Sequence, residues 1–159
     1  MATRLTAGTL TVTITESLTI DHNTNADDRS HSQTITKTFA SIDNLEKRVL
    51  NLPNTNQVQI AELGGTAAAD LGTYKRSTVE YIRITNLDDT NGVAVILEDN
   101  GADTAALLVD ADATLMLTDT QIEAFTDGSV WAGWSDIDKI FLKAASANTQ
   151  VEIVIATTE

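Results

Sequence analysis

The stretch Thr9-Leu10-Thr11-Val12-Thr13-Ile14-Thr15 alternates a threonine with an apolar residue at every step. Successive side chains of a β-strand point to opposite faces, so this period of two predicts a strand with one hydroxyl face and one apolar face. Threonine, valine and isoleucine are β-branched and suit an extended backbone. The apolar face continues through Leu18 and Ile20, after an interruption at Glu16-Ser17.

A second alternation follows, in which Ile35, Lys37 and Phe39 are opposed by Thr34, Thr36 and Thr38. The residues between the two alternations, 21–32, are polar and rich in turn-forming types. They predict a long exposed loop.

The middle of the chain carries the strongest hairpin signal. Residues 79–87 alternate Ile82 and Ile84 with Tyr81, Arg83 and Thr85, and residues 93–97 alternate again. The segment between them, Asp88-Asp89-Thr90-Asn91-Gly92, ends in an Asn-Gly pair that accepts positive φ. The pattern predicts two strands joined as a β-hairpin.

Further short strands are predicted along the rest of the chain. A turn at 41–46 leads into a strand that Pro53 stops, residues 65–72 read as a connection, and 118–125 read as one helical turn. The remaining strands are expected at 58–63, 106–109, 114–117, 139–143 and 150–156. About nine or ten short strands, without long helical periodicity, predict one all-β antiparallel sandwich domain over residues 1–159, jelly-roll-like, with a short polar N-terminal arm.

Composition excludes several classes of protein. The chain has 159 residues, 42% of them hydrophobic, and a mean hydropathy of -0.06. It holds no apolar run near the roughly 18 residues of a membrane span, and residues 1–6 lack the apolar core of a signal peptide. It also has no cysteine, which removes disulfides, thiolate metal sites and thiol nucleophiles. Synthesis and assembly in a cytosol are therefore expected.

The charge balance is strongly acidic. Ten basic and 23 acidic residues give a net charge of -13 and a pI of about 4.3. Such a surface repels phosphate backbones, which argues against nucleic-acid binding, and it keeps the folded chain soluble.

Two acidic segments imitate calcium loops. In the first, Asp21, Asn23, Asn25 and Asp27 place oxygen ligands at alternate positions, but Ala26 replaces the turn glycine and Ser32 the bidentate glutamate. An exposed loop is the favoured reading. The second, Asp99-Asn100-Gly101-Ala102-Asp103, is read as a turn. No metal and no cofactor is expected.

Catalytic arrangements are equally incomplete. Ser30, His31 and Asp27 have the residue types of a catalytic Ser-His-Asp triad, but the serine lacks the sequence of a nucleophile elbow, so catalysis is not expected there. Asp136 and Asp138 imitate a glycosidase pair but are more often the exposed side of a turn or strand. The chain is not expected to be an enzyme.

Trp131 and Trp134 are the residues most suited to an interface. Exposed, they would form a sugar-stacking platform or a protein-binding anchor; in a chain with 4% aromatic residues, packing in the core or between subunits is favoured. The candidate interface residues are Trp131, Trp134, Leu5, His22 and His31.

Four segments together resemble a class of small virion proteins from tailed phages, especially phages of cyanobacteria and other aquatic bacteria. They are the alternation at 10–14, Tyr81-Ile82-Arg83-Ile84-Thr85-Asn86-Leu87-Asp88, the segment Leu107-Leu108-Val109-Asp110-Ala111, and residues 151–156. The resemblance covers most of the chain and rests on strand motifs. No functional residue can be carried over from it.

The resemblance implies a jelly-roll decoration or cement protein on the outer surface of the capsid, assembled in the host cytoplasm. Such a protein binds the major capsid protein, often as a trimer at lattice junctions. The alternative is a tail, head-fibre or receptor-binding component that recognises glycans.

Overall fold

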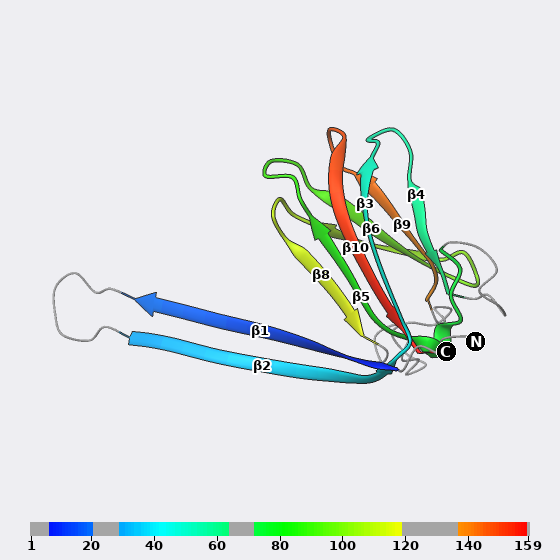
Figure 1. Ribbon diagram of the computed structural model, residues 1–159. Helices are drawn as coiled ribbons and strands as arrows, with labels where there is room; N and C mark the ends of the chain where they lie inside the picture. Colours follow the sequence, from blue (N-terminus) through cyan, green and yellow to red (C-terminus); the bar gives the residue numbers. More distant parts are fainter. Residues whose placement is uncertain (1–6, 21–28, 64–71, 119–136, 159) are drawn as a thin grey trace, which may run out of the picture. The chain divides into compact units, whose positions relative to one another are not determined.

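The structure is a computed structural model that describes residues 7–20, 29–63, 72–118 and 137–158. These residues form ten antiparallel β-strands and one short 3-10 turn, η1 (Arg76–Thr78), which confirms the predicted all-β class (Figure 1). The chain divides into two compact units, residues 1–42 and 43–159. Each unit is described by itself.

The first unit is a long two-stranded hairpin. β1 (Gly8–Ile20) pairs with β2 (Arg29–Ile42) from Gly8 opposite Ile42 to Ile20 opposite Arg29, with one bulge between Gly8 and Leu10. At about 3.4 Å per residue the paired strands extend roughly 40 Å. The expected loop at 21–32 is wrong at its end, because 29–32 belong to β2: their polar side chains do not prevent their backbone from pairing with β1. Residues 21–28 lie outside the described part.

The second unit is a sandwich of two four-stranded sheets. One sheet has the order β3-β10-β5-β8 and the other β4-β9-β6-β7. The strands are β3 (Asn44–Leu52), β4 (Val58–Glu62), β5 (Val79–Asn86), β6 (Val93–Asp99), β7 (Thr104–Val109), β8 (Thr114–Thr118), β9 (Ile137–Ala144) and β10 (Thr149–Thr157).

The strand pairs are nested, as in one long hairpin wound on itself. The pairs β3/β10, β4/β9, β5/β8 and β6/β7 follow one another inward, so that the first strand pairs with the last and the innermost two pair with each other. Winding then adds the lateral pairs β10/β5 and β9/β6. Eight strands in two sheets with this order are a jelly roll.

The predicted hairpin between residues 79–87 and 93–97 is wrong, although both strands exist. β5 and β6 lie in different sheets, and the segment between them crosses from one sheet to the other. The Asp88 carboxylate accepts the backbone N–H groups of Thr90, at 2.9 Å, and Asn91, at 2.6 Å. Asn86 Nδ2 donates to the carbonyls of Asn91 and Asp110. These bonds hold an arch between the sheets instead of a two-strand turn.

The core lies between the two sheets. In the central strands β5, β6, β9 and β10, inward-facing residues at alternate positions are almost fully buried; in β10, Val151, Ile153 and Ile155 are at most 1% exposed. Ile82 and Ile84 of β5 belong to the same cluster as Val93 and Val95 of β6. At 25 cal/mol per Å² of buried apolar surface, side chains of this size each contribute about 1.5–3 kcal/mol.

Other sequence predictions have mixed outcomes. The turn predicted at 41–46 is wrong in extent, because β2 runs to Ile42 and β3 begins at Asn44, which leaves Asp43 alone between them; Ser41 has a positive φ of 60°, and the strand predicted to run up to Pro53 is confirmed. The strands of the C-terminal half are confirmed with small shifts of their ends. Apart from Gly72 and Thr118, the connection at 65–72 and the helical turn at 118–125 lie outside the described residues.

Candidate functional site

The two faces of the β1–β2 hairpin differ in chemistry. The register places Thr11 opposite Thr38, Thr13 opposite Thr36, Thr15 opposite Thr34 and Ser17 opposite Ser32 on one face. The other face carries, in order along the hairpin, the cross-strand pairs Leu10–Phe39, Val12–Lys37, Ile14–Ile35, Glu16–Gln33 and Leu18–His31, and the register ends at Ile20–Arg29. We call the first the hydroxyl face and the second the apolar face.

The hydroxyl face suits contact with water. The Oγ1 atoms of Thr13 and Thr36 lie 3.5 Å apart, as do those of Thr15 and Thr34, and all four side chains are exposed. Cross-strand threonine pairs of this kind support a hairpin, each by about 0.2–1 kcal/mol relative to alanine pairs.

Part of the apolar face is exposed. Ile14 is 39% exposed, Ile35 49% and Leu18 54%. Nearer the other end of the face Phe39 is buried, at 4% exposed, and the Lys37 ammonium lies 4.8 Å from the centre of its ring. Within the described residues of the unit, β1 and β2 pair only with each other. A two-stranded hairpin alone is marginally stable in water, because it lacks a layer against which to bury its apolar side. The exposed part of the apolar face, at Ile14, Leu18 and Ile35, is therefore the candidate interaction surface.

A polar cluster joins the edge strands of the two sheets in the sandwich unit. The Tyr74 hydroxyl donates to the Glu46 carboxylate, Arg48 Nε lies 3.2 Å from the same carboxylate, and an Arg48 guanidinium N–H donates to the carbonyl of Ile60. Burial, together with the hydrogen bond to Glu46, raises the pKa of Tyr74 well above its usual value. Because Arg48 links β3 to the Ile60 carbonyl of β4, the cluster serves structure.

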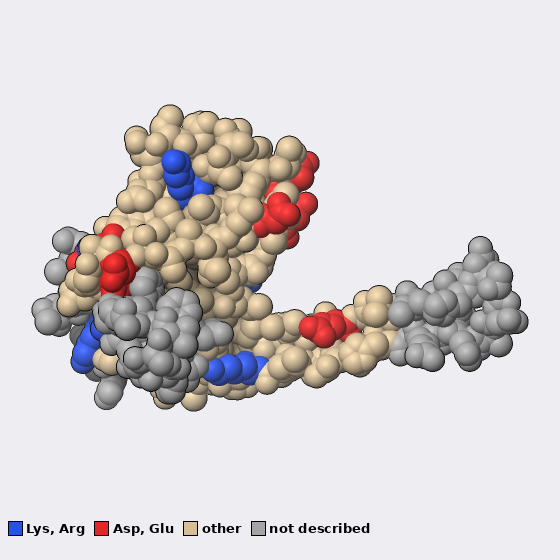
Figure 2. Space-filling model, turned by 180° about the vertical axis from the view of Figure 1, so that it is seen from behind, with Lys and Arg blue, Asp and Glu red and all other residues tan. Residues whose placement is uncertain are grey.

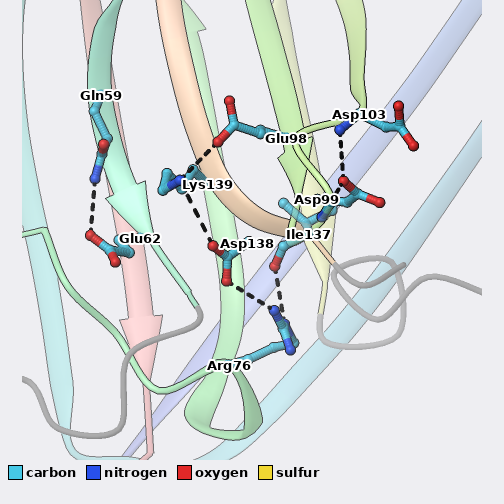
Figure 3. A network of polar contacts seen from close by, with 10 residues as sticks. Gln59, Glu62, Arg76, Glu98, Asp99, Asp103, Ile137, Asp138 and Lys139 are labelled. Carbon is cyan, nitrogen blue, oxygen red and sulfur yellow. Dashed lines mark hydrogen bonds and ion pairs between the residues drawn. The ribbon is translucent and has the colours of Figure 1, made fainter. Parts of the chain in front are cut away.

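A second cluster surrounds Asp138, one of the two acids that imitated a glycosidase pair. Arg76 donates to the carbonyl of Ile137 at 3.0 Å and lies 3.5 Å from the Asp138 carboxylate (Figure 3). Lys139 lies 4.0 Å from Asp138 and 2.8 Å from Glu98. These cations hold Asp138 in an ion-pair network that links η1 to β9. Asp136 lies outside the described residues.

The segment Asp99–Asp103 forms a turn, as predicted. The Asp99 carboxylate accepts the backbone N–H groups of Gly101 and Asp103, both at 2.8 Å, and its own N–H donates to the carbonyl of Asp103 (Figure 3). Its oxygens thus bond to the backbone of the loop that joins β6 to β7.

Of the five candidate interface residues, the structure describes one. His31 lies in β2 on the apolar face, opposite Leu18, and is exposed. Trp131, Trp134, Leu5 and His22 lie outside the described residues, as do Asp21, Asn23, Asn25 and Asp27 of the first calcium-like loop. In the ranges that the structure covers, no group of three metal-ligating acids or histidines occurs, and no helix is long and apolar enough to cross a membrane.

Sequence reasoning found the alternation of β1 and β2 but did not identify the pair as the interaction surface. The signal was present in the similar length and polarity of the two alternations, 9–15 and 34–39, which fit each other as one paired ribbon. The sequence did not reveal that no third strand joins them among the described residues of the unit, which follows from the register and topology.

Charge distinguishes the two units as well. Residues 1–42 hold three basic and four acidic residues, so nearly all of the net charge of -13 belongs to residues 43–159. Figure 2 shows little charge along the visible side of the hairpin. On the sandwich, the outward-facing Glu152 pairs with Lys47, at 2.7 Å, and with Arg83, and the hydrogen bond from Lys47 is the main cause that lowers its pKa.

No protein-family model matches the chain, and no curated protein matches it either.

Proposed function

We propose that the protein is a structural component of a phage particle, a decoration or cement protein that binds the outer surface of the capsid and strengthens contacts between major capsid subunits. The observation that carries the proposal is the hairpin: a two-stranded element about 40 Å long whose apolar face is exposed at Ile14, Leu18 and Ile35, with no third strand among the described residues of its unit. That the binding partner is a phage capsid is inferred from the strand motifs that resemble small virion proteins.

The mechanism divides the work between the two units. The jelly roll is a closed sandwich that needs no partner for its core, so it provides a rigid body that rests on the capsid. The hairpin provides a contact that links one body to a neighbour. Two linked bodies hold two capsid subunits at once, and the linkage raises the effective concentration of the second contact.

Capsid binding tests the proposal. Capsids assembled without the protein are incubated with the purified full-length chain, pelleted and imaged by cryo-electron microscopy. Saturable binding, with density on the outer capsid surface, is expected. Failure to pellet with capsids, or density confined to the tail or fibres, would overturn the proposal in favour of the receptor-binding alternative.

Matched variants test the part that the hairpin plays. Ile35→Asp adds a charge to the apolar face, and Thr36→Asp adds the same charge to the hydroxyl face one residue away. Capsid binding by Ile35→Asp is expected to weaken at least about tenfold through lost avidity, while Thr36→Asp binds like the wild type. Equal binding by both variants would remove the apolar face from the mechanism.

A further inference from the structure

We propose that β7, an edge strand of the sandwich, pairs antiparallel with β7 of a second copy of this chain, about a two-fold axis at Ala106. The pairing joins two four-stranded sheets into one eight-stranded sheet that crosses both copies. The inference goes beyond the proposed function, because the contact needs no capsid. It rests on the state of the four sheet edges and on the backbone groups that β7 leaves without a partner strand.

The other three edge strands are protected against the addition of a strand. β3 carries three consecutive charged residues, 46–48, and Pro53 follows it. The edge of β4 is bonded to a neighbouring segment, since the Glu62 N–H donates to the carbonyl of Gly72 at 2.7 Å. β8 has five residues, of which only Thr114 is exposed. Charges and covering segments are the means by which proteins keep sheet edges from pairing with other chains.

β7 has none of these protections. Its sequence, Thr-Ala-Ala-Leu-Leu-Val, holds no charge and no proline. Four of its six residues are exposed, and the largest of them, Leu108 and Leu107, are 68% and 45% exposed. Among the described residues β7 pairs with β6 alone. An uncharged and exposed edge of this kind is a template for a further strand.

The backbone groups that β7 offers at its outer edge follow from its bonds to β6. The Asp99 N–H donates to the carbonyl of Asp103 at 3.0 Å, so these two residues form a hydrogen-bonded pair at the start of the β6/β7 ladder. Such pairs recur at every second residue of an antiparallel ladder, and the residues between them point their N–H and C=O groups away from the partner strand. In β7 these outward residues are Thr104, Ala106 and Leu108.

A two-fold axis at Ala106 pairs these groups with themselves. It sets Ala106 opposite Ala106 of the other copy, and Thr104 of each copy opposite Leu108 of the other. Three hydrogen-bonded pairs result, in which every outward N–H and C=O of the two strands takes part. Side-chain sizes also match, because Leu108 comes to lie beside the small Thr104 and Leu107 beside Ala105.

A second copy fits this edge better than a single foreign strand. A foreign strand added to β7 would present its own outer edge, whereas the two-fold pair ends on both sides at β4, where Glu62 is already bonded. The contact is therefore closed at two copies, unlike the trimer that the phage resemblance implies. At six residues β7 is about 20 Å long, which makes a contact smaller than the roughly 1,200 Å² of a stable interface. A reversible monomer–dimer equilibrium is expected.

Charge outside β7 gives the contact a salt dependence. Residues 43–159 hold seven of the ten basic and 19 of the 23 acidic residues of the chain, and Asp103 and Asp110 stand at the two ends of β7. Two such acidic bodies repel each other, and salt screens the repulsion. The dimer Kd is therefore expected to fall when the NaCl concentration rises from about 0.1 M to about 1 M.

Sedimentation equilibrium of the full-length chain in about 1 M NaCl tests the inference. Ala106→Pro removes an N–H that points away from β6, so the variant keeps its own ladder, and Ala106→Glu places two carboxylates opposite each other on the axis. Each is expected to raise the dimer Kd at least about tenfold. Asn51→Glu, at an exposed position of β3, adds the same charge far from β7 and is expected to leave the Kd unchanged.

Disulfide formation tests the register, because the chain has no cysteine of its own. Opposite residues of a hydrogen-bonded pair have Cα atoms about 5.5 Å apart, within the range of a disulfide. Ala106→Cys is therefore expected to form a linked dimer with oxidised glutathione. Thr104→Cys alone is not, since its two copies lie four residues apart along the strands, about 14 Å. A mixture of Thr104→Cys and Leu108→Cys is expected to link the two variants to each other.

Circular dichroism of each variant checks that the strands are kept. A wild-type chain that stays monomeric up to millimolar concentration in 1 M NaCl would overturn the inference. So would an Ala106→Glu variant that dimerises like the wild type, equal weakening by Asn51→Glu, or linkage of Thr104→Cys as fast as that of Ala106→Cys. Each of these results concerns the free protein and leaves the capsid-binding experiment to be judged separately.

Discussion

β1 and β10 both place apolar residues at alternate positions and meet different surroundings. In β10, Val151, Ile153 and Ile155 face a second sheet and are almost fully buried. In β1, Val12, Ile14 and Leu18 lie on a hairpin that has no second layer among the described residues of its unit. Alternation therefore tells which face of a strand will be buried, and not what will bury it. A strand whose apolar face is uncovered within its own unit points to a partner.

The largest expected difference between the two regions is in the cost of removing an isoleucine. Ile153→Ala opens a cavity in the sandwich core and is expected to lower the free energy of unfolding by about 2–5 kcal/mol. Ile35→Ala, on the hairpin, is expected to change it by less than about 0.5 kcal/mol in dilute protein. Urea denaturation at a concentration where the chain is monomeric measures both. Equal costs would mean that the hairpin belongs to the cooperative core.

Tyr74→Phe tests whether the β3–β4 edge is part of that core. The change removes a hydroxyl that donates to the partly buried Glu46 carboxylate, and is expected to cost about 1–2 kcal/mol at pH 7. Because the pKa of Tyr74 is raised in the folded protein, unfolded chains ionise first as the pH rises above about 10, and wild-type stability falls there.

The phenylalanine variant lacks this ionisation and is expected to lose stability less steeply above pH 10. Urea midpoints from pH 7 to pH 11 measure the two slopes. Identical slopes for the variant and the wild type would contradict the burial and bonding assigned to Tyr74.

Removing the Glu152 carboxylate is expected to have a smaller effect on the stability of the sandwich, and one that depends on pH. The pKa of Glu152 is lowered by the hydrogen bond from Lys47 and by the charges of Lys47 and Arg83. A carboxyl with a lowered folded pKa stabilises the protein above its unfolded pKa, near 4, and that contribution is lost as the pH falls through the folded value. Glu152→Gln is therefore expected to lower the urea midpoint at pH 7 and to have little effect at pH 3. A midpoint shift of the same size at both values would count against the ion pairs.

The smallest predicted effect is a gain in stability. Ala102 has a positive φ of 66° and an exposed side chain, so Ala102→Gly relieves backbone strain and is expected to add about 0.5 kcal/mol. Ala106→Gly, at an exposed position in the extended strand β7, is expected to cost about 0.5–1 kcal/mol. Thermal unfolding of the two variants compares them. A loss of stability in both would show that the turn after Asp99 does not hold Ala102 in the left-handed region.

Local pattern predicted the strands better than their partners. The ends of β5, β6 and β10 follow from alternation and turn residues, since both are properties of neighbouring side chains. The partners of β5 do not, because pairing with β10 and β8 depends on contacts far apart in the sequence. Asn86 fell within the predicted strand and Asp88 within the predicted turn, and the sequence pattern does not show the hydrogen bonds by which the two residues hold the arch.

The candidate site shows the same limit. The apolar face of β1 was predictable from residues 9–15, and His31 was placed among the candidate interface residues. The position of His31 on that face was not predictable, because His31 lies in a segment that was expected to be a loop. The composition of that face emerges only once the register pairs Val12 with Lys37 and Glu16 with Gln33.

Hydrogen exchange of the free and the capsid-bound protein tests the division between a self-sufficient sandwich and a hairpin that needs a partner. In the free protein, amides of β1 and β2 are expected to exchange fast, because an uncovered hairpin opens readily, while β10 and β5 exchange slowly. With capsids added, protection is expected to rise most in β1 and β2. Hairpin amides as protected as those of β10 in the free protein, or added protection on the sandwich strands alone, would contradict the account.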